Sequence, residues 1–293
     1  MDCYNISGYI IGLYDFPKNL IWDRFDDFIY TKSKPQICFK ISSYPINKFN
    51  IIPADAEQLV NHPLYMTYKY NDATHFFGSQ HDIISYTRVN NNYTECLINI
   101  QPEYYNQLSD VKTCEHICND VMINIRKILT GRLSLDKGFI IHSCIIEFNG
   151  VGILFSAASG TGKSTHARLW QKVFPTTKII NGDNGFCRII ENTPIIFSTP
   201  WCGDSNQYTD KSIPIKAIVF LEQAYTNSIE QLNELDSFLY LSARCYLPFW
   251  DEELINKSLE VVKTLTTEVD CYLLKCLPDH DAVRIVYDEI FGL

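Results

Sequence analysis

The segment Val151–Thr165, VGILFSAASGTGKST, places the strongest constraint on how this chain can fold. The short apolar run Gly152–Phe155 comes first, and a glycine-containing turn follows it. Lys163–Phe174 then repeats apolar residues at helical spacing. Residues Ala157–Ser164 fit the phosphate-loop pattern, with alanine in place of the first glycine and Gly-Lys-Ser intact. A strand, such a loop and a helix in this order predict a nucleotide site in an α/β domain.

The loop sequence also indicates a chemistry. Backbone N–H groups of such a loop point into one concavity at the positive end of the following helix, which suits an anion with several oxygens. Lys163 would reach the outer phosphates as a point charge, and the Ser164 hydroxyl would ligate Mg²⁺. The structural alternative is an ordinary Gly/Ser turn between a strand and a helix, and the flanking pattern favours the nucleotide site.

Composition and charge exclude several classes of protein. The chain has 293 residues, enough for two domains or one large one. A net charge of −9, without a Lys/Arg run, argues against nucleic acid or an anionic membrane as a main partner. The 11 cysteines are odd in number and irregularly spaced, so we expect free thiols in a reducing cytoplasm. The N-terminus does not resemble a signal peptide, and no apolar run approaches the roughly 20 residues that span a bilayer.

Residues 1–110 predict a small β-rich (α+β) domain. Short alternating runs at Ile37–Ile41, Tyr65–Tyr70, Ile83–Val89 and Glu95–Ile100 are typical of strands, and Pro, Asn and Asp clusters separate them. A short helix is expected around Ala54–Leu59. This half contains no catalytic constellation, so we expect it to position a substrate or a neighbouring subunit, and a homo-oligomer stays open.

Residues 111–293 predict an α/β domain. The first part, 111–130, has helical spacing of apolar residues and is interpreted as a connecting helix. From Gly138 onward strands and helices alternate, as expected for helices packed on one sheet. The expected strands are Phe139–Phe148, Gly152–Phe155, Thr177–Ile180, Phe186–Ile190, Pro194–Ser198, Ile215–Leu221 and Cys271–Cys276. The expected helices follow the loop, cover about Leu232–Cys245 and Glu252–Thr267, and begin after Pro278.

Two polar residues near the loop are candidates for catalysis. Asp183 lies in Asn181–Asn184, directly after an apolar run, where a carboxylate at a strand end can hold Mg²⁺ or act as a base. Taken alone, the same letters fit a tight turn equally well. His142 lies in an apolar run that we expect to pair with the strand of the loop. A single histidine in a strand is more often a packing residue, but this position would bring it near a phosphate.

The order of these pieces resembles the catalytic core of HPr kinase/phosphorylase, whose fold is shared with phosphoenolpyruvate carboxykinase. The similar stretches begin at His142 and include SGTGKSTHARLW, Asn181–Asn184, TPWCG, AIVFLEQA and LKCLPDHDAV. The closest resemblance is to HPr-kinase-like proteins found with bacterial peptide-modification systems. It covers about half the chain, from roughly Gly138 to the C-terminus. It implies an α/β fold, with a C-terminal phosphate-loop domain of this kind beside the smaller β-rich domain.

The resemblance implies roles for particular residues. Asp183 would be the base or a metal ligand with Ser164, and His142 would contact the phosphoryl group. Where HPr kinases have two adjacent Asp residues, this chain has one, with Gly182 or Asn184 in the other place. The HPr kinase signature rich in Gly and Arg is also absent, and TPWCGDSNQY stands there instead. The residues implied to bind the triphosphate are Ser159, Gly160, Thr161, Gly162, Lys163, Ser164 and Thr165.

These observations predict a Mg²⁺-dependent kinase that uses ATP, with GTP or ADP left open. The expected acceptor is a hydroxyl, from Ser or Thr of a peptide or from a small serine-like molecule. Asp183, His142 and Lys163 are the expected catalytic residues. The alternative is a nucleotide-binding regulator or scaffold without transfer chemistry. A carboxykinase is disfavoured by the short chain, and a GTPase or mechanical ATPase by the missing base-reading motif, although Glu222 stays possible as a distal acid.

Overall fold

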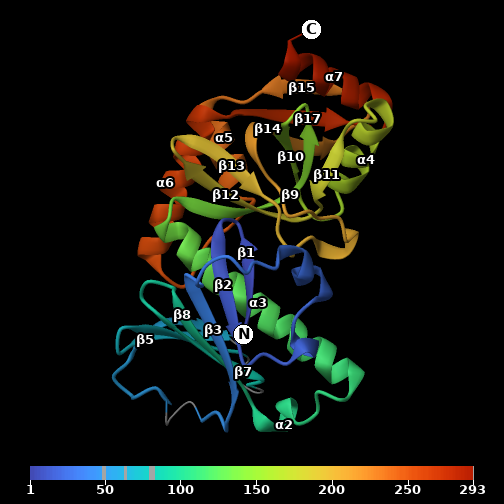
Figure 1. Ribbon diagram of the computed structural model, residues 1–293. Coiled ribbons are helices and arrows are strands. Elements are labelled where there is room, and N and C mark those ends of the chain that lie inside the picture. The colour runs from blue at the N-terminus through green and yellow to red at the C-terminus, as the bar shows by residue number, and fades with distance from the viewer. Residues whose placement is uncertain (48–50, 63–64, 79–82, 293) are drawn as a thin grey trace. The chain divides into compact units, whose positions relative to one another are not determined.

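The computed structural model describes residues 1–47, 51–62, 65–78 and 83–292. The chain forms two compact units (Figure 1). Unit 1 contains Met1–Leu135 and the short segment Pro248–Glu253, and unit 2 contains Asp136–Leu247 and Leu254–Leu293. The boundary expected at residue 110 therefore lies after Leu135, because the helix interpreted as a connector belongs to unit 1. Along the described ranges, no helix is both long enough and apolar enough to cross a bilayer.

Unit 1 is built on an eight-stranded sheet in the order β1-β2-β3-β8-β7-β6-β5-β4. Its strands are β1 (Asp2–Ile6), β2 (Tyr9–Tyr14), β3 (Ile37–Ser43), β4 (Glu57–His62), β5 (Tyr65–Tyr70), β6 (Ala73–Phe77), β7 (Ser85–Asn90) and β8 (Glu95–Ile100). β3 pairs in parallel with both β2 and β8, and the strands from β4 to β8 form an antiparallel meander. The strands predicted in this half are confirmed. The helix predicted at Ala54–Leu59 is wrong, since Glu57–His62 pairs with β5 as an edge strand.

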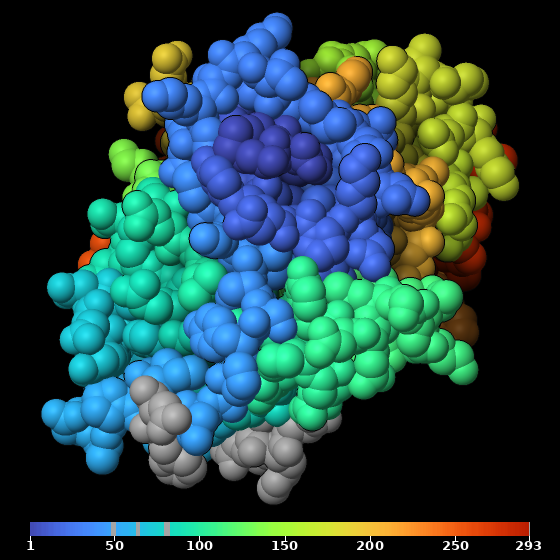
Figure 2. All heavy atoms as spheres, turned by 60° about the horizontal axis from the view of Figure 1, so that its bottom comes forward, coloured from blue at the N-terminus to red at the C-terminus, as the bar shows by residue number. Residues whose placement is uncertain are grey.

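The long helix α3 (Val111–Leu135) covers the strands β7 and β8 of this sheet. Its buried stripe includes Val121, Ile125 and Leu129, as the helical spacing predicts. The short helices η1 (Lys18–Leu20), η2 (Asp23–Phe28) and α2 (Pro102–Tyr105) complete the unit. Figure 2 shows the N-terminal residues beside α2 and the start of α3, where the Asn19 side-chain amide donates to the Leu108 carbonyl at 3.2 Å.

Unit 1 also buries a cluster of polar side chains under α3. The Ser85 hydroxyl donates to the Asp120 carboxylate at 2.5 Å, and the Asn124 amide donates to the same carboxylate at 3.2 Å. The Lys127 amine donates to the Asn124 side-chain oxygen at 3.1 Å and lies 5.1 Å from the ring centre of Phe76. Burial raises the pKa of Asp120 and lowers the pKa of Lys127.

Unit 2 contains nine strands in one connected sheet that folds back on itself. They are β9 (Gly138–Phe148), β10 (Val151–Ser156), β11 (Lys178–Asn181), β12 (Asn184–Ile190), β13 (Thr193–Phe197), β14 (Ser212–Gln223), β15 (Ser228–Gln231), β16 (Cys245–Tyr246) and β17 (Asp270–Cys276). The order is β10-β9-β12-β13-β14-β17-β15, β11 and β16 pair with β9, and β10 also pairs with β14 in parallel. β9 is long enough to pair with β10 and β11 at one end and with β12 and β16 at the other.

Helices cover both sides of the central strands β10, β14 and β17 (Figure 1). On one side α4 (Lys163–Val173) and α7 (His280–Phe291) pack on the sheet. On the other side lie α5 (Glu234–Ser242), α6 (Glu252–Glu268) and the strands β12 and β13. β14 contributes Ile218 and Phe220 to one core and Val219 and Leu221 to the other, which explains its continuous apolar sequence. The predicted strands and helices of this half are confirmed, and the unit is a mixed α/β structure.

Candidate functional site

The glycine-containing loop joins β10 to α4, as the sequence predicts. Gly160 and Gly162 have φ values of +78° and +115°, and a Cβ built on either would meet no described atom within 4 Å. Gly162 is also the N-cap of α4, and within the described chain no side chain caps that helix and no acidic residue lies in its first turn. The loop therefore leaves open space in front of an uncompensated positive helix end, which is the arrangement that binds anions.

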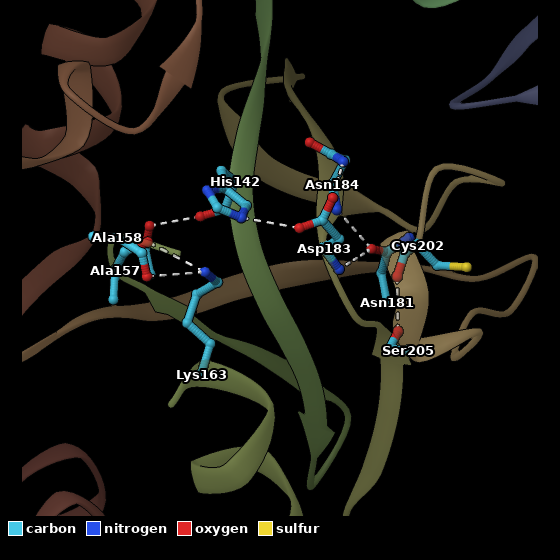
Figure 3. Close-up of polar contacts among 10 residues, drawn as sticks. His142, Ala157, Ala158, Lys163, Asn181, Asp183, Asn184, Cys202 and Ser205 are labelled. Atoms are coloured by element: carbon cyan, nitrogen blue, oxygen red, sulfur yellow. Dashed lines mark hydrogen bonds and ion pairs between the residues drawn. The ribbon is translucent and has the colours of Figure 1, made fainter. Parts of the chain in front are cut away.

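The Lys163 side chain folds back over this loop. Its amine donates to the carbonyl oxygens of Ala157 at 3.2 Å and Ala158 at 3.5 Å (Figure 3). The residue is 8% exposed, and burial lowers the pKa of its amine, while the Asp183 carboxylate acts in the opposite direction. A cation that is partly desolvated and held only by neutral carbonyls gains strongly from an anion placed beside it.

The turn Asn181–Asn184 is fixed by a buried side chain. The Asn181 side-chain oxygen Oδ1 accepts from the backbone N–H groups of Asp183 and Asn184, both at 2.9 Å. Its amide donates to the Thr199 carbonyl at 2.9 Å, and the Thr199 hydroxyl donates to the Asn184 carbonyl at 2.7 Å. Asn181 and Thr199 are both fully buried. This network fixes the backbone that presents Asp183, so the turn has a positioning role as well as the backbone tolerance predicted from its sequence.

His142 and Asp183 form a hydrogen-bonded pair. β9 and β12 pair antiparallel with Asn184 opposite His142, which brings the neighbouring Asp183 beside the imidazole. His142 Nε2 lies 2.9 Å from Asp183 Oδ1, and the two side chains point toward one another in Figure 3. The Asn184 amide donates to the other carboxylate oxygen. His142 therefore lies next to the loop strand, as predicted, and its contact in this structure is the Asp183 carboxylate.

A cavity of about 320 Å³ brings these residues together. The loop contributes Ser159, Gly160, Gly162, Lys163, Ser164 and Thr165, and the facing side contributes His142, Gly182, Asp183, Cys202, Gly203, Asp204 and Ser205. Of the residues expected at the site, only Thr161 is outside this lining, and it lines a second cavity that shares Gly160, Gly162 and Thr165 with the first. Glu222 is exposed and accepts a hydrogen bond from Tyr240 at 3.2 Å, and it does not line the 320 Å³ cavity.

Sequence reasoning missed how the segment after β13 completes this cavity. Cys202–Ser205 lies against the Asn181–Asn184 turn, and a Cβ on Gly182 would come within 1.9 Å of the Ser205 hydroxyl oxygen. Position 182 therefore cannot carry a second carboxylate without displacing Ser205. Asp204, from the 3₁₀ helix η3 (Gly203–Ser205), lines the cavity instead. The sequence TPWCGDS contains no local signal that Asp204 lines the same cavity as Asp183.

The donor set fits a hard cation such as Mg²⁺. The Ser164 hydroxyl and the carboxylates of Asp183 and Asp204 all line the cavity and offer oxygen ligands, which Mg²⁺ prefers. In the part of the chain that the structure describes, no group of three or more His, Cys, Asp or Glu side chains is arranged to hold a metal by itself.

Comparison with solved structures gives a distant similarity, and the two other comparisons give no match. No protein-family model matches the chain, and no curated protein matches it significantly. Among solved structures, the chain is similar to the HPr(Ser) kinase/phosphatase from Coxiella burnetii, with 8% sequence identity and a TM-score of 0.30. The match covers 52% of this chain and 99% of that chain. It is a distant structural similarity.

Proposed function

We propose that this protein is a Mg²⁺-dependent kinase that transfers the γ-phosphoryl group of ATP to a hydroxyl. The supporting observation is the 320 Å³ cavity, in which a phosphate loop with Lys163 and Ser164 faces the His142–Asp183 pair. Phosphoryl transfer depends mainly on positioning and on charge neutralisation. The cavity offers a cation and loop amides on one side and a carboxylate on the other, which are the groups that this reaction needs.

The loop side of the cavity would hold the nucleotide phosphates. The backbone N–H groups from Ser159 to Thr165 would bind the phosphate oxygens, and the Lys163 amine would exchange its two carbonyl partners for them. Ser164, Asp183 and Asp204 would hold Mg²⁺. When bound, ATP and Mg²⁺ supply the phosphoryl group and offset the charge that develops on it.

The facing side would activate the acceptor. The Asp183 carboxylate would accept the hydroxyl proton while the acceptor oxygen forms its bond to phosphorus and the bond to the leaving phosphate oxygen breaks. His142 and Asn184 each donate a hydrogen bond to this carboxylate and so hold it in one orientation. His142 is therefore proposed as a positioning residue for Asp183.

The acceptor would enter past Cys202–Ser205. These residues line the cavity opposite the loop and carry no bulky side chain, so a serine or threonine of a peptide, or a small serine-like molecule, fits the class of acceptor. We infer no nucleic-acid or membrane partner, and the net charge of −9 supports this view.

The test is incubation of the protein with labelled ATP and Mg²⁺, with serine-containing peptides and free serine as candidate acceptors, followed by mass spectrometry. The expected result is a mass increase of one phosphoryl group on one acceptor class, absent without Mg²⁺. The Lys163→Met protein serves as the matched control. If the protein binds ATP but transfers to no hydroxyl acceptor, including water, it is a nucleotide-binding regulator. The single carboxylate in the Asn181–Asn184 turn is the observation that favours this second function.

A further inference from the structure

Arg244 is a half-buried cation next to the proposed site. It lies just after α5, where the chain turns toward β16. Its backbone is fixed on both sides, since its N–H donates to the carbonyl of the buried Leu241 at 2.9 Å and its carbonyl accepts from the His142 N–H at 3.0 Å. Within the described part of the chain, its guanidinium makes no hydrogen bond and no ion pair. The fold therefore positions this residue precisely and leaves its charged group unused.

Strand pairing brings Arg244 to the face of the sheet that carries His142. β16 pairs antiparallel with β9, with Cys245 opposite Ile141. One residue further along, Arg244 lies opposite His142 and accepts its N–H. On the other edge of β9, β12 places Asn184 opposite the same histidine. Because side chains directly opposite one another in neighbouring strands lie on one face, Arg244, His142 and Asn184 form one row across three strands.

The charge of Arg244 acts on the proposed site. Burial lowers the pKa of the Lys163 amine, and the positive charge of Arg244 lowers it further. The Asp183 carboxylate acts on Lys163 in the opposite direction, but it already accepts hydrogen bonds from His142 and Asn184. A partly desolvated guanidinium beside a like charge gains free energy when an anion binds to it.

The position of Arg244 favours the acceptor over the triphosphate as the source of this anion. Arg244 does not line the 320 Å³ cavity, in which the loop amides, Lys163 and Mg²⁺ would offset the charge of the phosphates. The Asp183 carboxylate reaches toward His142 from one side, and Arg244 begins on the other side of the same histidine. Neighbouring strands are about 4.8 Å apart, a spacing that an arginine side chain can bridge. An acceptor with its hydroxyl at Asp183 would therefore present a second group to Arg244.

We propose that Arg244 is a specificity-determining residue that binds a carboxylate of the acceptor, close to the hydroxyl that is phosphorylated. The proposal rests on the function proposed above, because it takes that hydroxyl to lie at Asp183. A planar guanidinium donates two parallel hydrogen bonds to a carboxylate, so it recognises shape as well as charge. Two sources offer such a group within a few bonds of a hydroxyl: the α-carboxylate of free serine, and an aspartate next to serine in a peptide.

The test measures phosphoryl transfer from ATP, at saturating Mg²⁺, to matched acceptors with and without the carboxylate. One pair is serine and serinamide. The other pair is a C-terminally amidated peptide that contains Ser-Asp and the same peptide with Ser-Asn. The native protein is expected to prefer the carboxylate member of one pair by about 10- to 100-fold in kcat/KM. The pair that shows this preference identifies the source of the carboxylate.

Arg244→Gln should abolish the preference. Its KM for the carboxylate acceptor should rise about 10- to 100-fold and its kcat should change less than about threefold, since the phosphate loop and Asp183 are intact. Its KM for the neutral acceptor should change less than about twofold. Arg244→Lys should restore part of the preference, because an ammonium group keeps the charge and loses the paired donors. Arg168→Gln, at an exposed position of α4, is the matched control and should keep the full preference.

Three results would overturn the proposal. Equal use of both members of each pair by the native protein would show that the acceptor carboxylate is not recognised, and the kinase function would stand. An equal loss of kcat for carboxylate and neutral acceptors in Arg244→Gln would place the guanidinium at the transferred phosphoryl group instead. Transfer to none of the four acceptors would overturn the proposed kinase function together with this proposal.

Discussion

Two polar clusters in this chain each contain a lysine and an aspartate, yet they differ in how their groups are satisfied. In unit 1, Lys127 and Asp120 are joined through Asn124 and Ser85, so side chains supply partners for both charges. In unit 2, Lys163 donates only to neutral carbonyl oxygens in the hydrogen bonds described above, and it faces a cavity that it shares with Asp183. Burial lowers the pKa of both lysines.

This difference shows why a shifted pKa alone does not identify a site. Structural networks perturb titratable groups as strongly as catalytic ones do. What distinguishes the unit 2 cluster is its open geometry, with a lysine, a carboxylate and a phosphate loop around one space. The unit 1 cluster is a closed network, and we infer that it stabilises the packing of α3 on the sheet. Each substitution below tests one side of this contrast.

The largest effect is expected for Lys163→Met. Removal of the amine should lower the rate of phosphoryl transfer by about 10³-fold, because one preorganised charge that stabilises the transition state is lost. The free energy of unfolding should stay within about 0.5 kcal/mol of the native value, since a desolvated amine is replaced by an apolar side chain. Single-turnover kinetics and urea denaturation measure the two quantities. A large loss of stability without a loss of phosphoryl transfer would show that Lys163 has a structural role, like Lys127 in unit 1.

Asp183→Asn should follow, with a loss of about 10²- to 10³-fold in kcat, because the amide cannot accept the acceptor proton. The amide has nearly the shape of the carboxylate and can keep a hydrogen bond with His142. Because Asp183 is also a proposed Mg²⁺ ligand, kcat is measured at saturating Mg²⁺ and ATP, which separates the loss of the base from weaker Mg²⁺ binding. Asp204→Asn is the matched control in the same cavity. It should weaken Mg²⁺ binding and leave saturated turnover higher than in Asp183→Asn. Full activity of Asp183→Asn would contradict the assignment of this residue as the base.

The unit 2 elements were predictable because local patterns and tertiary packing agree there. The run from Ile215 to Leu221 is apolar throughout since β14 is buried on both faces, and the loop glycines mark the start of α4. The helix predicted at Ala54–Leu59 is wrong because so short a segment also fits a helical turn. Pairing of Glu57–His62 with β5 stabilises a strand there instead.

The candidate site was only partly predictable for a related reason. Lys163 and Asp183 follow the ends of β10 and β11, two strands that both pair with β9, and a sequence can indicate such strand ends. The contact of His142 with Asp183 depends on the register of β9 against β12, and the cavity wall at Asp204 depends on a loop that folds across the turn. Neither the strand register nor the path of the loop leaves a local signal in the sequence. The arrangement of residues around the cavity therefore could not be predicted from the sequence and was seen only in the structure.

In the polar cluster of unit 1, Lys127→Met should leave ATP affinity and the rate of phosphoryl transfer unchanged within about twofold. It should lower the free energy of unfolding by about 1–3 kcal/mol, because the buried Asn124 side chain loses a hydrogen-bond donor and the half-buried Asp120 carboxylate loses a compensating charge. Urea denaturation at constant pH measures the change, and Lys112→Met, at an exposed position of the same helix, is the control. A loss of transfer with unchanged stability would show that unit 1 takes part in the reaction.

An effect of similar size on stability, seen only on acidification, is expected at His166, whose ring is kept neutral by burial. Its pKa is about 4 in the folded protein, against 6.5 for an unperturbed histidine, with burial as the main cause and the Asp279 carboxylate acting in the opposite direction. On acidification, the His166 side chain of the unfolded chain therefore becomes protonated near pH 6.5, whereas in the folded protein it becomes protonated only near pH 4. The stability that His166 contributes is complete above pH 6.5 and decreases as the pH falls toward 4.

Between pH 7 and pH 5 the free energy of unfolding of the native protein should fall by about 2 kcal/mol more than that of His166→Phe. Denaturation curves of both proteins at the two pH values give this difference, in which the titration of all other groups cancels. Parallel losses in the two proteins would mean that the buried His166 ring is protonated in the folded protein.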